Sequence, residues 1–290
     1  MQEGWLERGG VRLHYLEWGP EDATRKPALF LLHGLSSNAR VWERMAARLP
    51  DRRIVALDQR SHGLSDRPAS GYTANELAAD AAHAVESLGL ERPAVAGHSW
   101  GGAVALDFAA RFPALVSGLA IVDGPIAAMS RNMTWEQVAQ RMQPPFPTYA
   151  DLDAAAAAQA AYLDGAWQDD LRDFVEAGLT RTPAGYVSTL TAPVRLTILR
   201  ELYAHQPEAL LPRVEGPLLI AVAGRAWRHA PESFMEQKRR SAEAVLAIRP
   251  DAQVRWYDSP HDIPLVRPSE LAADLEETLL TVAGSRQDSA

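Results

Sequence analysis

The sequence predicts an α/β protein built on a mostly parallel, eight-stranded sheet with helices on both faces. The first sign is a set of short apolar runs, such as residues 28–32 and 217–223, which are typical of strands covered on both sides. Helical patterns separate most of these runs, and strands that alternate with helices form parallel sheets. The chain is also long enough for one large domain with a buried core, since it has 290 residues, of which 47% are hydrophobic.

The sheet is expected to begin with a hairpin, because residues 4–7 and 11–18 alternate apolar and polar side chains on either side of Gly9-Gly10. Later strands are continuous apolar runs, and the helices between them carry start and stop signals. Thr73 and Glu76, for example, form a capping pattern for a helix that Gly89 ends. The remaining strands are expected at residues 28–32, 53–57, 93–96, 118–122, 217–223 and 253–257, with helices at 40–49, 73–88, 100–112, 232–247 and 269–282.

The alternation of strands and helices pauses after Asp123. Residues 124–212 contain no run typical of a buried strand, and Pro144-Pro145-Phe146-Pro147 is one of the breaks between their helical stretches. We therefore expect a core made of residues 1–123 and 213–290, with residues 124–212 inserted as a helical cap or lid. The helices of this insertion are expected at residues 135–142, 149–163, 167–179 and 193–203.

The composition argues against several classes of function. The net charge is −8 and no stretch is strongly basic, which argues against a protein that binds nucleic acid. Without cysteine there is no disulfide, thiolate metal site or cysteine nucleophile. No apolar run approaches the roughly 18–20 residues of a membrane span, and residues 1–5 do not resemble a signal peptide. We expect a soluble cytoplasmic protein without a bound metal, either a monomer or a homodimer.

The chemistry is predicted to centre on Gly97-His98-Ser99-Trp100-Gly101, which lies between an apolar run and a helical run of small residues. A strand that turns sharply into a helix needs a backbone without bulky side chains at the bend, and Gly97 and Gly101 meet this need. Ser99 would then stand at the start of a helix. Free backbone N–H groups and the helix dipole favour a developing negative charge at that place.

This turn resembles the nucleophile elbow of the α/β-hydrolase superfamily. Two further segments resemble motifs of that family. One is the turn His33-Gly34 after the first long apolar strand, and the other is the loop 58–65, which is similar to Asp-x-Arg-Gly-x-Gly-x-Ser with Ser61 in place of a glycine. The resemblance covers about residues 5–282 and implies the α/β-hydrolase fold, a serine nucleophile and no cofactor. It argues against the haloalkane dehalogenase and epoxide hydrolase branches, which use aspartate at the elbow.

A serine hydroxyl is a weak nucleophile that needs a base, and the base needs an orienting acid. The family order of nucleophile, acid and histidine implies that the base is His261, which follows the last expected strand. The usual position of the acid, after the seventh strand, holds Ala226. Some members carry the acid after the sixth strand, so we assign this role to Asp123. Asp262, and a triad weakened by Ala226, remain as alternatives.

The resemblance also implies two backbone N–H groups that hold the oxyanion of the transition state. One belongs to Trp100, the residue after the nucleophile, and the other to Leu35. Gly34 would allow the close approach of this second loop, and His33 would organise its turn.

Other residues near these motifs receive structural roles. Asp58 and Arg60 are expected to tie their loop to the His33 turn through charged hydrogen bonds, and the side chain of His98 is expected to point away from the nucleophile. Apolar residues of the insertion and its surroundings are expected to line an acyl pocket. The candidate pocket residues are His33, Gly34, Met129, Trp135, Phe146, Trp167 and Trp227.

The leading hypothesis from the sequence is a serine hydrolase that acts on a small carboxylic ester or lactone. A carbon–carbon bond hydrolase or a proline-type aminopeptidase of the same superfamily remains as an alternative. A non-enzymatic receptor for a small ligand is a third reading, because a fold alone does not determine a function.

Overall fold

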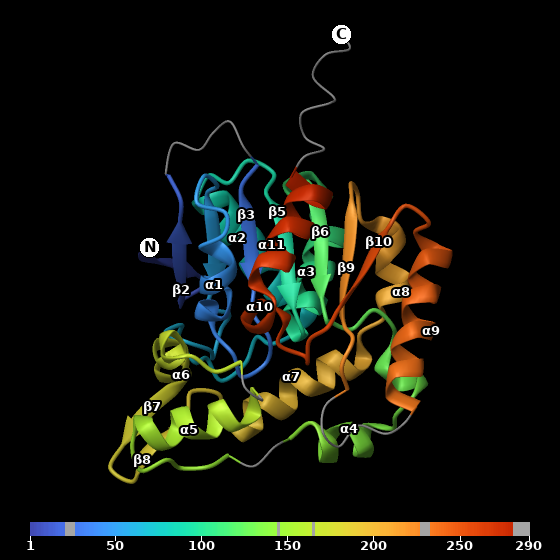
Figure 1. Cartoon of the computed structure of the whole chain (residues 1–290). Coiled ribbons are helices and arrows are strands. Elements are labelled where there is room, and N and C mark those ends of the chain that lie inside the picture. Colours follow the sequence, from blue (N-terminus) through green and yellow to red (C-terminus); the bar gives the residue numbers. More distant parts are fainter. Residues whose placement is uncertain (21–26, 144–145, 164–165, 227–232, 281–290) are drawn as a thin grey trace.

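The computed structural model describes residues 1–20, 27–143, 146–163, 166–226 and 233–280. Its centre is an eight-stranded sheet with the strand order β1-β2-β4-β3-β5-β6-β9-β10 (Figure 1). Strand β2 pairs antiparallel with β1 and β4, and the other pairs are parallel, which confirms the predicted sheet. The strands are β1 (Gln2–Arg8), β2 (Val11–Trp18), β3 (Leu29–Leu32), β4 (Ile54–Leu57), β5 (Ala94–His98), β6 (Gly118–Val122), β9 (Leu218–Ala223) and β10 (Gln253–Tyr257).

The register of the central strands brings three chain segments to one edge of the sheet. Leu32 of β3 pairs with Gly97 of β5, and His98 pairs with Val122 of β6. The residues that follow these strands therefore emerge side by side at the carboxyl edge. Ligands of open α/β sheets bind at this edge, so the functional site is expected there.

Helices cover both faces of the sheet because side chains of a strand point alternately to opposite sides. Phe30 and Leu32 of β3 join one buried cluster, and Leu29 and Leu31 join the other. The first cluster lies under α2 (Ala74–Ser87), α3 (Trp100–Arg111), α8 (Pro207–Leu210) and α9 (Ser233–Ile248). The second lies under α1 (Glu43–Ala46), α10 (Ile263–Val266) and α11 (Pro268–Leu275).

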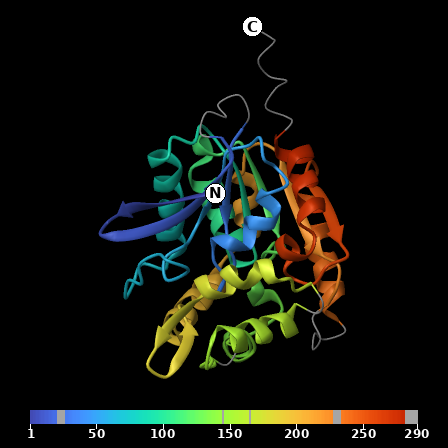
Figure 2. The ribbon, with the colours of Figure 1, turned by 60° about the vertical axis from the view of Figure 1, so that its left-hand side comes forward.

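The segment between β6 and β9 lies along the carboxyl edge of the sheet in both ribbon views (Figures 1 and 2). Its helices are α4 (Trp135–Arg141), α5 (Leu152–Tyr162), α6 (Arg172–Ala177) and α7 (Ala192–Ala204). A short hairpin of β7 (Leu179–Thr182) and β8 (Gly185–Ser188) follows α6 and was not expected from the sequence. Its side chains are half-exposed or exposed, so it lacks the apolar run by which the buried strands were recognised.

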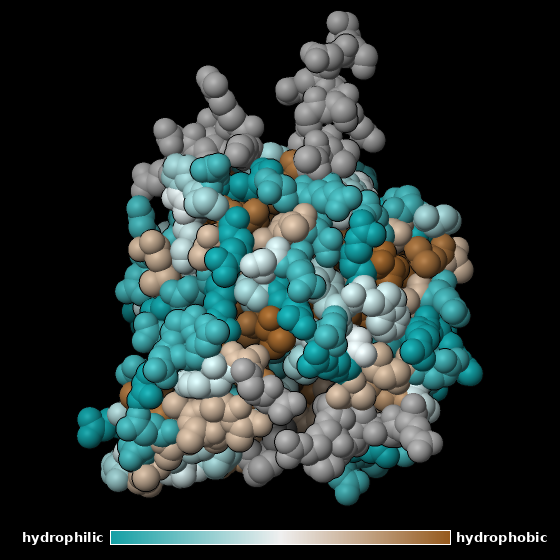
Figure 3. Space-filling view, viewed as in Figure 1, coloured by the Kyte–Doolittle hydropathy of each residue, from teal (hydrophilic) through white to brown (hydrophobic). Residues whose placement is uncertain are grey.

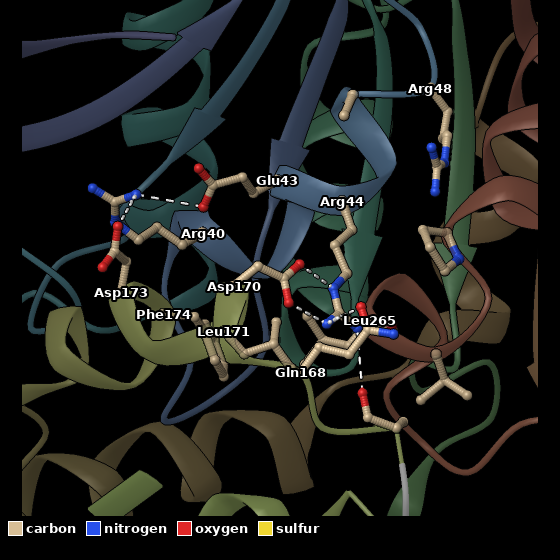
Figure 4. A pocket seen from close by; sticks show the side chains of 14 residues that line it. Arg40, Glu43, Arg44, Arg48, Gln168, Asp170, Leu171, Asp173, Phe174 and Leu265 are labelled. Carbon is tan, nitrogen blue, oxygen red and sulfur yellow. Dashed lines mark hydrogen bonds and ion pairs between the residues drawn. The ribbon is translucent and has the colours of Figure 1, made fainter. Parts of the chain in front are cut away.

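Arg44 of α1 joins the inserted segment to the core. Its guanidinium donates hydrogen bonds to Asp170 at 2.5 and 2.8 Å and to the carbonyl of Leu265 in α10 at 2.9 Å (Figure 4). A cavity of about 620 Å³ lies at this seam, and its lining includes Phe174. Its lining contains none of the three residues predicted to carry catalysis, so we interpret it as a gap between packed layers.

Figure 3 shows polar side chains over much of the visible face, with an apolar area over α5. Four alanines of this helix, at positions 154, 157, 158 and 161, are exposed there. Within the described ranges no helix is both long and apolar enough to span a bilayer.

We predict that Gly101→Ala destabilises the protein by about 3 kcal/mol, at the upper end of the usual cost of overpacking. A Cβ atom at Gly101 would lie 2.4 Å from the carbonyl oxygen of Leu32 and 2.5 Å from that of His33, so α3 would have to move away from β3. The gain in helix propensity, about 1 kcal/mol, does not offset this clash. Denaturant unfolding measures the effect.

Gly178→Ala is the matched control, because its Cβ would meet atoms only at ordinary contact distances of 3.4 Å and beyond. It should change the free energy of unfolding by less than about 0.5 kcal/mol. Equal effects of the two substitutions would contradict the close approach of α3 to β3.

Candidate active site

Ser99 stands at the junction of β5 and α3 in a strained backbone conformation. Its φ is 54° and its ψ is −122°, a region that residues with a side chain rarely adopt. The flanking glycines make this bend possible, since a Cβ at Gly97 would lie 2.1 Å from the carbonyl oxygen of Gly101. The sharp turn leaves the Ser99 side chain partly exposed at the N-terminus of α3.

The loops after β3 and β6 approach Ser99 from either side. A Cβ at Gly34 would lie 3.1 Å from the Cβ of Ser99, and one at Gly124 would lie 2.8 Å from the carbonyl oxygen of Ser99. The amide of Ser99 donates to the carbonyl of Val122 at 2.9 Å, which fixes the elbow against the end of β6. Gly34 and Asp123, the neighbour of Gly124, are thereby held close to the elbow.

His261 and Asp123 are in direct contact although 138 positions separate them. The Nδ1–H group of His261 donates to Oδ2 of Asp123 at 2.7 Å. Oδ1 of Asp123 accepts hydrogen bonds from the backbone N–H of Ala223 at 2.9 Å and from the ammonium of Lys238 at 2.7 Å. The Asp123 side chain is 5% exposed and that of His261 is 36% exposed, so the pair lies at the boundary of the core.

The charges around this pair keep Asp123 ionised and favour protonation of His261. Burial alone would raise the pKa of Asp123, but the hydrogen bonds and charges of His261 and Lys238 outweigh it and lower this pKa to about 2. Burial likewise opposes protonation of His261, whereas the hydrogen bond and the negative charge of Asp123 raise its pKa above the usual value. Asp123 is therefore a carboxylate at neutral pH, able to stabilise an imidazolium.

His98 links the elbow to the loop that carries His261. Its Nε2–H group donates to the backbone carbonyl of His261 at 3.0 Å, and the centres of the two rings are 4.8 Å apart. Burial and the adjacent charge of His261 lower the pKa of His98 to about 4, so it is neutral.

In the described part of the chain, no hydrogen bond joins the Ser99 hydroxyl to the His261 ring. Such contacts often tighten only when substrate is bound.

Asp262 has a different partner from Asp123. Its negative charge raises the pKa of the exposed phenol of Tyr162 in α5. The acid in hydrogen-bond contact with the His261 ring is thus Asp123. Ala226, at the usual position of the acid, is exposed.

The turn that follows β3 is organised by His33, as the sequence analysis expected. The buried His33 ring donates from Nδ1 to the carbonyl of Gly34 at 2.8 Å and accepts the amide of Gln59 at Nε2 at 3.0 Å. The Gln59 side chain returns a hydrogen bond to the carbonyl of His33 at 2.7 Å. Leu35, a predicted oxyanion donor, belongs to this turn, and Trp100, the other donor, is the first residue of α3.

The expected tie to the His33 turn was wrong for Arg60, which forms a buried ion pair with Asp80 of α2, with N–O distances of 2.6 and 2.7 Å. Asp58 does join its loop to the segment after β3, because its carboxylate accepts a hydrogen bond from the amide of Ala39 at 2.7 Å. It also accepts one from the ring of His14 at 2.8 Å. Gln59 is a further link between the two loops, through its hydrogen bonds with His33.

The candidate pocket residues are spread over several elements. Met129 and Trp135 pack partly buried against the cluster under α3, and the ring of Trp135 contacts that of Tyr203 in a tilted arrangement, with ring centres 5.8 Å apart. Trp167 packs against the opposite cluster, and Phe146 is exposed. Trp227 lies outside the described residues. Lining of an acyl pocket by these side chains remains a prediction.

Lys238 is a member of the site that the sequence analysis missed. It lies on α9, its side chain is 17% exposed, and its ammonium contacts both Asp123 and the carbonyl of Ala223. A single lysine on an amphipathic helix carries no sequence signal of such a contact, since only the packing of α9 against β9 brings it there. Among the described residues, no three histidine or acidic side chains gather as metal ligands would.

Comparison with known proteins identifies the family of this chain. A family model described as the alpha/beta hydrolase fold matches residues 27–261. Lipase LipV of Mycobacterium tuberculosis is 28% identical over 274 residues, which cover 93% of this chain and 98% of the lipase. Epoxide hydrolase 1 of Caenorhabditis elegans is 36% identical over 145 residues, but these cover 47% of this chain and only 35% of that protein. The crystal structure of E-2-(acetamidomethylene)succinate hydrolase superposes with a TM-score of 0.80 at 24% identity, covering 95% and 98% of the two chains. The chain belongs to the α/β-hydrolase family.

Proposed function

We propose that this hydrolase cleaves a carboxylic ester or lactone through an acyl-enzyme formed on Ser99. The observation that carries the proposal is the 2.7 Å hydrogen bond from His261 to Asp123. His98, the neighbour of the strained Ser99 at the strand–helix turn, holds the backbone of His261 through a further hydrogen bond. A hydrogen bond at Nδ1 leaves Nε2 of His261 unprotonated and able to accept the proton of the serine.

The reaction then has two stages. Ser99 Oγ attacks the carbonyl carbon while its proton passes to Nε2 of His261, and the oxyanion accepts hydrogen bonds from the amides of Leu35 and Trp100. His261 returns the proton to the leaving alkoxide as the tetrahedral intermediate collapses. A water molecule, deprotonated by His261, next attacks the acyl-enzyme and releases the acid and the free serine.

Two observations favour esters and lactones within the family. The relative named a lipase matches over 98% of its length. The similarity to the epoxide hydrolase covers only part of both chains, and the elbow here carries a serine rather than an aspartate. We further propose that residues 124–212 act as a lid over the carboxyl edge of the sheet and line the acyl pocket.

We predict that the protein hydrolyses short- and medium-chain aryl esters and that Ser99→Ala lowers kcat by on the order of 10⁴-fold or more. The loss follows because no other group of the site offers an activated hydroxyl. Release of the phenol, followed by absorbance, measures the rates. Unchanged turnover by Ser99→Ala would contradict the proposal, and amide or carbon–carbon cleavage without ester cleavage would favour the other branches of the superfamily.

We predict that Asp123→Asn lowers kcat by about 10⁴-fold, because an amide at this position favours the wrong tautomer of His261 and cannot stabilise its imidazolium. Asp262→Asn is the matched control and should lower kcat by much less, since Asp262 forms no hydrogen bond with the His261 ring among the described residues and acts on it only through its charge. Steady-state rates with the same aryl ester compare the two. Equal losses would contradict the assignment of the acid.

We predict that Lys238→Met moves the acid limb of kcat/KM to higher pH. The positive charge of Lys238 opposes protonation of His261, so its removal raises the pKa of this base further above the usual value. The base must be neutral to accept a proton, and a higher pKa means that a higher pH is needed to deprotonate it.

Lys238→Arg keeps the positive charge and should leave the acid limb close to that of the wild-type protein. A pH profile of kcat/KM between pH 5 and 9 distinguishes the variants. An acid limb that stays in place or moves to lower pH in Lys238→Met would show that the lysine does not act on the base.

A further inference from the structure

A buried arginine without a counter-ion lies beside the loop that is proposed to hold the oxyanion. Arg195, in the first turns of α7, is 9% exposed. Its Nε–H group donates to the carbonyl of Met142 at 2.9 Å, and Nη1 donates to the hydroxyl of Ser36. Both partners are neutral oxygens, and no carboxylate of the described residues pairs with this guanidinium.

Burial without a counter-ion has an energetic consequence. It lowers the pKa of Arg195 to about 10, and no nearby negative charge opposes this effect. A guanidinium at this pKa is still charged at neutral pH, so the structure holds a positive charge without a counter-ion at a buried position with little access to water. Nη2 has no protein partner among the described residues and is not sealed from solvent, which leaves an open side for another group.

The groups next to Arg195 do not supply the missing negative charge. His62 accepts the amide of Ser36 at Nε2 at 3.1 Å and donates from Nδ1 to the carbonyl of Arg60 at 3.0 Å, which fixes its neutral tautomer. Burial and the charge of His33 lower the pKa of His62 to about 3, with a contribution from Arg195 itself.

Two arginines of the inserted segment have carboxylate partners. Arg131 pairs with Glu208 at 3.0 Å, and Arg172 contacts Asp153. Arg200, one turn further along α7, is exposed and lies over the ring of Trp135 with its guanidinium carbon 4.4 Å from the ring centre. Among the described arginines of this segment that lack a carboxylate partner, Arg195 is the buried one, and water compensates a buried charge least.

Arg195 is close to the reacting centre through a short run of chain. Ser36, its hydrogen-bond partner, is exposed and follows Leu35 directly, and Gly34 approaches the Cβ of Ser99. Because neighbouring Cα atoms are about 3.8 Å apart, the guanidinium is within about two residues of the proposed oxyanion donor. A second functional group of a small substrate, a few bonds from its reacting carbonyl, would reach Arg195.

We propose that Arg195 binds a non-reacting carboxylate of the substrate, so that the natural substrate is an acidic ester or lactone such as a half-ester of a short dicarboxylic acid. This proposal rests on the proposed hydrolase function and names the substrate class of the same site. A planar guanidinium with free N–H groups matches a carboxylate, and a charge-assisted hydrogen bond is about twice as strong as a neutral one.

Matched pairs of substrates test this proposal. The monomethyl esters of malonate, succinate and glutarate are compared with the methyl esters in which the carboxylate is replaced by a carboxamide of the same shape, and released methanol gives kcat/KM. The wild-type protein should prefer the carboxylate in at least one pair by about 10²-fold, and Arg195→Gln should reduce this preference by a similar factor. Arg195→Lys keeps the charge without the fork and should retain part of the preference.

Arg200→Gln is the matched control on the same helix, since it removes an exposed positive charge and should leave the preference within about twofold. The proposal is overturned if the wild-type protein shows no carboxylate preference in any pair, or if Arg195→Gln leaves the preference intact. Thermal unfolding of each variant verifies that the fold is retained.

Two further measurements separate this proposal from the function on which it rests. Covalent labelling of Ser99 by an organophosphate, read as a mass increase that Ser99→Ala abolishes, tests the nucleophile alone. Calorimetric binding of monomethyl succinate to Ser99→Ala, with and without Arg195→Gln, tests the carboxylate site alone. Labelling without carboxylate preference rejects the Arg195 proposal only, whereas binding that depends on Arg195 without labelling or turnover rejects the hydrolase function only.

Discussion

The hydrogen bond between His261 and Asp123 depends on the positions at which β6 and β9 end. Asp123 follows β6, and the pairing of this strand with β5 on one side and β9 on the other sets its position. The amide of Ala223, the last residue of β9, donates to Asp123, so the strand end itself orients the carboxylate. An imidazole carried by a distant loop thus meets a fixed acceptor.

Two residues with an unusual backbone conformation lie directly after β5 and β6. Ser99 and Asp123 both have positive φ values, 54° and 45°, although neither is a glycine. Each such residue costs on the order of 1–3 kcal/mol and persists only where the surrounding structure imposes it. Here the flanking glycines and the parallel pairing of β5 with β6 impose it.

The sequence was sufficient for the parts of the structure that have local signals. Apolar runs predicted the buried strands, and glycine spacing predicted the elbow around Ser99, because each depends on neighbouring residues. The hairpin formed by β7 and β8 lacks a buried run and was missed. Arg60 was given the wrong partner, because a long side chain reaches Asp80 on α2 through packing that no local pattern records. Lys238 was missed for the same reason.

Lys238 and Arg195, the two cations near the site, differ in their partners, and this difference affects which substrates the site would bind. Lys238 is paired with Asp123, whereas the guanidinium of Arg195 has no carboxylate partner among the described residues. The whole chain carries −8, but exposed charges more than about 10 Å away are screened by salt. A buried guanidinium is screened much less, so its charge acts strongly on a small ligand that approaches it. The net negative charge of the chain would repel an anionic substrate only weakly at a distance, and the guanidinium of Arg195 would attract it at the site. The proposed site would therefore select anionic over neutral substrates when they bind.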